Sequence, residues 1–267
     1  VREGHAWMAV FAMTLCPFVR GAVTSGVPEA LSVLLVPLFL LFLARGFRDE
    51  RPKRFIVAAG ILGAFLVLDG AYGGIVGALA GAWVVIEHFW QEPSRRRVIL
   101  IRASAVAAPA VCGLLLLRQV LVSSAHPTLE QSPAGLSESL PWWPVQLVGG
   151  TDLTSFFVPV ALFPSHMPAP TAHRHVVYIG IVLLVAVCVA GRKRASRGPL
   201  LLAFVAGLLA LGPELRVWGR AYDGLSLPGV WLWDAGARNL YRVAGLVPLA
   251  SIMAIALAWG RKKDRAS

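Results

Sequence analysis

Charged residues are scarce in this sequence. Of its 267 residues, 15% are charged and 57% are hydrophobic, with a mean hydropathy of +0.69. Soluble domains carry about 25% charged and about 45–50% apolar residues, so a soluble globular enzyme of this length would lack the charges that its surface needs. Disorder needs low hydrophobicity with high net charge, so this composition excludes it too. The class that remains is a protein that crosses the lipid bilayer several times.

Cysteine is also rare, and the common catalytic signatures are missing. Cys16, Cys112 and Cys188 lie far apart inside apolar runs without a CxxC spacing, which is typical of small packing residues. The sequence contains no Walker A loop, GxSxG elbow, HExxH or GxGxxG pattern. A nucleotide-driven pump is therefore disfavoured.

Long apolar runs dominate the chain. A spanning helix needs about 20 mostly apolar residues, with a range of about 17–25. We expect residues 1–267 to form a single all-α domain, a polytopic transmembrane helical bundle of about eight membrane runs. The runs are 6–19, 27–44, 55–68, 71–90, 98–122, 176–191, 199–212 and 240–260.

The basic residues indicate which way the chain crosses the bilayer. The net charge is +11, but the basic residues are spread over short loops, so we expect no nucleic-acid partner. If every run crosses once, the clusters at 45–54, 95–97, 192–197 and 261–265 fall on one side, which the positive-inside rule makes cytoplasmic. This pattern predicts a bacterial inner-membrane protein with both termini in the cytoplasm. Arg102 and Arg242 lie within apolar runs.

Two long segments, 123–175 and 213–239, are expected to be non-cytoplasmic loops. Loops of this length are uncommon unless they are functional. Aromatic residues within them predict that both loops lie along the membrane interface. Trp142 and Trp143 belong to the first loop, and Trp231 follows a Leu-Pro-Gly turn in the second, which predicts a short interfacial helix or a re-entrant turn there.

Two acids are candidate general bases. Asp152 opens the segment DLTSFFVP, which predicts an N-cap followed by a short helix that Pro159 ends. Asp69, with Tyr72, lies at an expected outer turn between two runs. Each acid has two interpretations: a helix cap, or a carboxylate that lines an outward-facing cavity.

Two arginines are candidate phosphate ligands. Arg238 and Arg242 are four residues apart, so they share one face of a helix at its outer end. Their planar forks suit the phosphate of a lipid, although the same residues could extend to lipid headgroups without a specific ligand. His166, His173 and His175, with Asp152, offer nitrogen and oxygen donors. We expect solvated histidines there and assign no metal or cofactor, while a divalent metal stays possible.

The order of several short motifs resembles that of bacterial polytopic membrane proteins in the C-type glycosyltransferase (GT-C) superfamily, in particular their C-terminal portion. The chain starts without Met, which fits such a portion. The motifs extend over roughly residues 24–260: TSGVPE at 24–29, VPL at 36–38, LDGAY at 68–72, TDLTSFFVP at 151–159, YIG at 178–180, LGP at 211–213, LPG at 227–229 and LYRV at 240–243.

The resemblance implies transfer of a sugar from a polyprenyl-phosphate-linked donor on the non-cytoplasmic face. Asp152 and Asp69 are then the catalytic candidates. Arg238, Arg242, Tyr72, Trp142, Trp143 and Trp231 would contact the donor or its lipid phosphate. The chain departs from the family pattern because it has no acidic first outer loop and has Leu246 where a second arginine often follows Arg242. These departures leave open a second interpretation, a non-catalytic membrane protein that is a degenerate or truncated family member, a lipid or polysaccharide carrier, or an assembly subunit.

Overall fold

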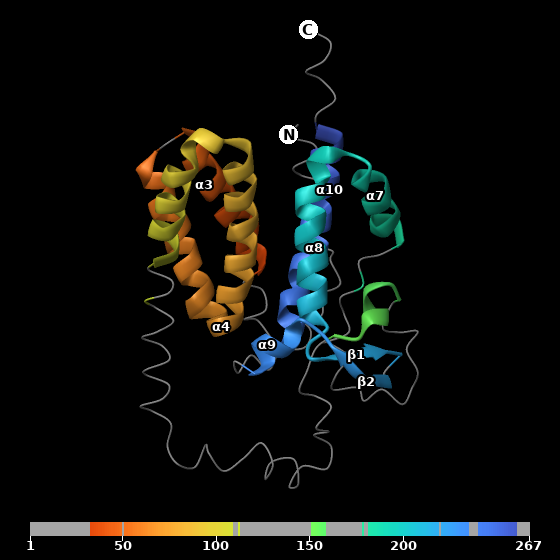
Figure 1. Cartoon of the computed structure of the whole chain (residues 1–267). Helices are drawn as coiled ribbons and strands as arrows, with labels where there is room; N and C mark the ends of the chain where they lie inside the picture. Colours follow the sequence, from red (N-terminus) through yellow and green to blue (C-terminus); the bar gives the residue numbers. More distant parts are fainter. Residues whose placement is uncertain are drawn as a thin grey trace, which may run out of the picture.

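The computed structural model describes residues 33–49, 51–108, 112, 151–158, 178, 181–218, 220–234 and 240–260. The described chain is mostly helical, as expected, with one small antiparallel sheet (Figure 1). Two groups of helices lie next to each other, and the sheet lies at one end of the second group.

The first group begins with α3 (Val36–Asp49), which follows a 3-10 turn at 33–35, and continues with α4 (Pro52–Gln91). Although α4 is helical over 40 residues, it folds back on itself (Figure 1). A Cβ placed at Gly77 would lie 3.0 Å from the Phe65 ring, whereas residues 12 apart in a straight helix are about 18 Å apart. The reversal lies between residues 65 and 73. The fold-back falls where the sequence analysis expected a turn between the runs 55–68 and 71–90, although α4 stays helical through it.

Glycine and phenylalanine positions explain how closely these helices approach. A Cβ at Gly73 would collide with the carbonyl oxygen of Phe65, so only glycine allows the two limbs of α4 to meet there. Phe39 of α3 packs edge-on against Phe65, with ring centroids 5.9 Å apart. Gly81, on the second limb, lies against the Phe39 ring. The result is a core shared by α3 and both limbs of α4.

A further helix follows the turn η2 (Pro93–Arg95) and is described over residues 96–108. Its inward face follows the helical period and consists of Ile99, Arg102, Ala103 and Val106. The first part of the predicted run 98–122, residues 98–108, is helical.

The second group contains α7 (Ile181–Gly191), η8 (Arg194–Ser196), α8 (Arg197–Ala210), η9 (Leu240–Gly245) and α10 (Leu246–Gly260). Helix α10 packs against both α8 and α7. The Ser196 hydroxyl donates a hydrogen bond of 2.7 Å to the carbonyl of Ala190, which closes the loop between α7 and α8. The indole of Trp83 in α4 lies against Gly198 at the start of α8 and joins the two groups.

The two segments that were expected to be long loops hold more regular structure than the sequence predicted. A hairpin of β1 (Glu214–Val217) and β2 (Arg220–Ser226) occupies about half of the second expected loop. After it, α9 (Gly229–Asp234) confirms the short helix expected at Trp231. From the first loop, η5 (Leu153–Phe156) packs against β1. We call η5, the hairpin and α9 the cap.

The basic segments and the cap lie at opposite ends of the helices (Figure 1). The connections from α3 to α4, from α4 to η2 and from α7 to α8 share one end, which we call the basic end. In the described chain this end holds Arg45, Arg48, Arg51, Lys53, Arg54, Arg95, Arg96, Arg97, Arg192, Lys193, Arg194 and Arg197. The side of a membrane that this end faces stays a prediction.

Helix boundaries and membrane crossings were predicted only in part. Helix α3 continues to Asp49, beyond the expected end of the run 27–44, and the run 240–260 starts as a 3-10 helix before α10. The run 6–19 lies outside the described residues. Within the described chain, two segments are long and apolar enough to cross a membrane: Gly73–Gln91, with 19 residues, and Arg242–Trp259, with 18. A bundle of eight crossings stays a prediction.

Candidate functional site

Asp152 connects two parts of the cap, η5 and the hairpin. It is fully buried and is the N-cap residue of η5. Its Oδ1 accepts hydrogen bonds from the backbone N–H of Thr154 at 2.8 Å and from that of Trp218 at 3.3 Å. The Trp218 N–H also donates to Thr154 Oγ1 at 2.9 Å. Thr151 N–H donates to the carbonyl of Ala210 at 2.6 Å, which attaches the segment to the end of α8. We call this set of contacts the cap junction.

Trp218 occupies an unusual backbone conformation in the hairpin turn. Val217 pairs with Arg220, so Trp218 lies at the first position of the short connection between the two strands. Trp218 has φ of 55°, and two-residue hairpin turns favour asparagine or glycine at such positions. A bulky residue there costs about 1–2 kcal/mol. The acceptors Asp152 Oδ1 and Thr154 Oγ1 both fix the Trp218 N–H and thereby offset this cost.

The structure confirms the capping role predicted for Asp152. An N-cap acceptor satisfies helix N–H groups that have no partner within the helix. The role of Asp152 as a general base stays a prediction. Its carboxylate is buried and Oδ1 already accepts two backbone hydrogen bonds.

The other predicted site residues are only partly described. Arg242 lies in η9, where the chain enters α10, and is half-buried. Trp231 projects from α9 with 81% of its side chain exposed. Asp69 and Tyr72 belong to the helical backbone of α4 at its reversal, but their side chains lie outside the description. Arg238, Trp142 and Trp143 lie outside the described residues. The structure therefore brings Asp152 and Arg242 to the same end of the helices and leaves the remaining set untested.

The described part of the chain offers no metal centre, since no three of its His, Cys, Asp and Glu residues are grouped to hold an ion. The candidate ligands His166, His173 and His175 lie outside that part.

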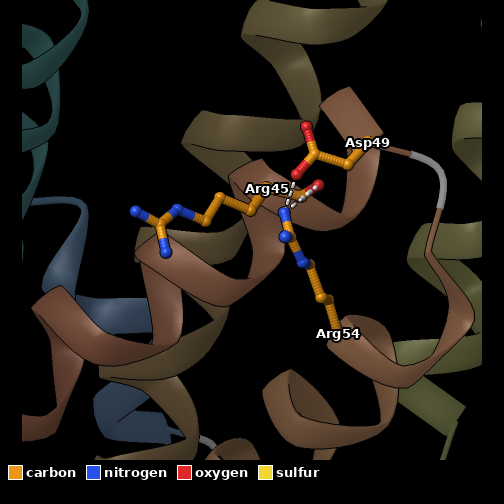
Figure 2. Close-up of polar contacts among 3 residues, drawn as sticks. All are labelled: Arg45, Asp49 and Arg54. Atoms are coloured by element: carbon orange, nitrogen blue, oxygen red, sulfur yellow. Dashed lines mark hydrogen bonds and ion pairs between the residues drawn. The ribbon is translucent and has the colours of Figure 1, made fainter.

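The sequence analysis did not anticipate the local pairing of charges at the basic end. Arg54 Nη1 forms an ion pair with Asp49 and donates to the carbonyl of Arg45 at 3.4 Å (Figure 2). The guanidinium of Arg45 points away from this pair. Arg95 pairs with Glu92 at 2.6 Å. Asp49 and Glu92 are thus engaged by near neighbours in the chain, and the other basic residues of this end provide a net positive surface.

Comparison of the chain with protein-family models, with curated proteins and with solved structures finds no match.

Proposed function

We propose that this chain is an integral membrane protein in which the spans Gly73–Gln91 and Arg242–Trp259 cross the bilayer, and α3, α7, α8 and the first limb of α4 lie beside them. The observation that carries the proposal is the apolar surface of these helices and of the helix at 96–108. Soluble proteins expose single hydrophobic residues but rarely large contiguous apolar areas. Here the exposed large aliphatic and phenylalanine side chains on and beside these helices are Leu34, Leu38, Leu41, Ile56, Val57, Ile86, Val98, Leu100, Ile101, Val185, Val189, Leu201 and Phe204.

Exposed aromatic residues occur at both ends of this surface. Trp90 and Trp259 end α4 and α10 at the basic end, while Trp218, Tyr222 and Trp231 belong to the cap. Tryptophan and tyrosine are enriched at both membrane–water interfaces. The 18-residue span that ends at Trp259 would be about 27 Å long as an α-helix, close to the hydrocarbon thickness of about 30 Å. We place the basic end in the cytoplasm and the cap on the opposite side of the inner membrane.

On this membrane frame we propose transfer of a sugar from a polyprenyl-phosphate-linked donor, the activity that the resemblance to GT-C proteins implies. Arg242 supports the proposal because it lies at the cap end of the span Arg242–Trp259, the depth of outer-leaflet phosphates. A guanidinium there can stabilise the charge that develops on a phosphate leaving group. The acceptor hydroxyl would need a carboxylate base within hydrogen-bond reach, and Asp69, next to the reversal of α4, is a second candidate beside Asp152.

A non-catalytic membrane role is the second candidate. One observation favours it: the carboxylate of Asp152 is fully buried and serves the cap junction. A group in this position stabilises the outer structure without contacting a substrate.

A transfer assay in proteoliposomes separates the two functions. The membranes would contain a polyprenyl-phosphate-linked sugar and a set of acceptors. The transferase proposal expects activity in the wild type and a loss of at least 100-fold in Asp69→Ala and Arg242→Ala, because each removes a group that acts in the transition state. Asp234→Ala is the control, an acid of the cap with no proposed role. Normal transfer by both variants would refute the site, and absence of transfer with every donor would favour the non-catalytic role.

A further inference from the structure

Arg102 interrupts the apolar contact face of the helix at 96–108. Its neighbours on that face, Ile99 and Val106, are 2% and 4% exposed, while most of the helix outside this face is exposed. A charged side chain at membrane depth is costly and typically faces a partner or a polar ligand. Arg102 therefore needs a negatively charged partner, which the apolar residues of this face do not provide.

The contacts of Arg102 leave a donor unused. Its Cζ lies 5.6 Å from the centre of the Phe55 ring, a cation–π contact at the start of α4. Its Nη1 is buried and donates to no acceptor among the described residues. Every ion pair found at this end in the described chain involves another arginine, since Asp49 pairs with Arg54 and Glu92 pairs with Arg95.

In the membrane arrangement proposed above, Arg102 lies near the phosphates of the cytoplasmic leaflet. It follows Arg96 by six residues, which is about 9 Å along the helix axis. Arg96 marks the basic end: its Nε donates to the carbonyl of Phe89 at 3.2 Å, and its guanidinium lies 5.9 Å from the centre of the Trp90 ring. Trp90 is 71% exposed, as expected for an interfacial tryptophan. A ligand that reaches Arg102 from this end thus comes from the boundary between headgroups and hydrocarbon.

We propose that Arg102 binds the phosphate of an anionic lipid in the cytoplasmic leaflet. The inference rests on the proposed membrane location and is independent of the sugar-transfer activity. Phe55 holds the guanidinium plane, and the fork presents two N–H groups to two phosphate oxygens. The basic residues Arg96 on the same helix and Lys53 in α4 favour an anionic lipid over a zwitterionic one. Basic pockets between helices on the cytoplasmic side are established sites for anionic headgroups.

Native mass spectrometry of the detergent-purified chain, titrated with phosphatidylglycerol and with phosphatidylcholine, tests the proposal. We expect wild type to prefer phosphatidylglycerol, and Arg102→Gln to weaken that binding about tenfold, which corresponds to about 1.4 kcal/mol. Arg97→Gln is the matched control: it removes the same charge from an exposed position of the same helix and should change binding less than threefold. Arg102→Lys keeps the charge but loses the fork, so its affinity should lie between the two.

Three results would overturn the proposal: unchanged phosphatidylglycerol binding in Arg102→Gln, equal losses in Arg97→Gln, or displacement of the lipid by millimolar inorganic phosphate, which would identify a site for the free anion. Phe55→Leu keeps the apolar packing but removes the cation–π contact, so it tests the site if Arg102→Gln does not fold, and a several-fold weakening is expected. A chain that needs no detergent would instead refute the membrane location itself.

Discussion

Two substitutions of Asp152 are expected to affect the stability of the cap junction to different extents. Asp152→Ala removes the N-cap acceptor of η5 and one of the two acceptors of the Trp218 N–H. Asp152→Asn keeps an oxygen at Oδ1 but cannot act as a base at neutral pH. The pair therefore separates a structural carboxylate from a catalytic one.

The magnitude follows from the hydrogen bonds. Loss of an N-cap costs about 1 kcal/mol, within a range of about 0.5–2 kcal/mol. The Trp218 N–H keeps its hydrogen bond of 2.9 Å to Thr154 Oγ1. Loss of its second hydrogen bond, to Asp152 Oδ1, therefore adds only a fraction of the N-cap cost. We expect Asp152→Ala to destabilise the cap by about 1–2 kcal/mol. Asparagine and aspartate cap about equally well, so Asp152→Asn should cost about 0.5 kcal/mol.

Hydrogen exchange in detergent micelles measures this directly, because local opening controls the exchange of protected amides. In Asp152→Ala the amides of Thr154 and Trp218 should exchange about 5–30 times faster, since about 1.4 kcal/mol corresponds to tenfold. Amides of α10 should be unchanged. Equal protection in Asp152→Ala and wild type would refute the junction. Loss of sugar transfer in Asp152→Asn with a protected cap would show that the carboxylate is the base.

Two other predictions concern the backbone. Gly73→Ala places a methyl group against the Phe65 carbonyl, and the strain of overpacking should lower stability in detergent by about 2 kcal/mol or more. Gly63→Ala is the control, because a Cβ there meets nothing within 4 Å, and it should leave stability unchanged or raise it by up to about 1 kcal/mol. Equal thermal shifts in the two variants would contradict the fold-back of α4. Trp218→Val should be less stable than Trp218→Asn by about 1–2 kcal/mol, because φ of 55° suits asparagine and not a β-branched residue. Equal midpoints of the two variants in chemical unfolding would argue against that backbone conformation.

Periodicity and composition were enough to find most helices in the described chain. The runs 55–68 and 71–90 meet within the LDGAY segment at 68–72, and the two limbs of α4 follow that division. Asp152 was recognised as a cap because a short polar side chain preceded an apolar segment that ended in proline. Both inferences rest on local sequence signals, and contacts with the rest of the protein did not change the local structure that these signals favour.

The hairpin was missed because its turn lacks the usual signal. Two-residue turns are recognised by Asn-Gly or Asp-Gly, whereas here the connection between the paired Val217 and Arg220 begins with Trp218. The left-handed conformation of Trp218 depends on acceptors 64 and 66 residues away in sequence, Thr154 and Asp152. No local pattern carries that information. Likewise, Arg102 was seen inside an apolar run, but only the packed helices show that it lies on the inward face.

Site-directed labelling tests the membrane arrangement most directly. With the three native cysteines replaced by alanine, single cysteines at Lys53, in the basic end, and at Tyr222, in the cap, would be treated with a membrane-impermeant maleimide in intact cells. The account predicts labelling at position 222 in intact cells and at position 53 only after the membrane is permeabilised. Labelling of position 53 in intact cells, or equal labelling of both positions, would contradict it.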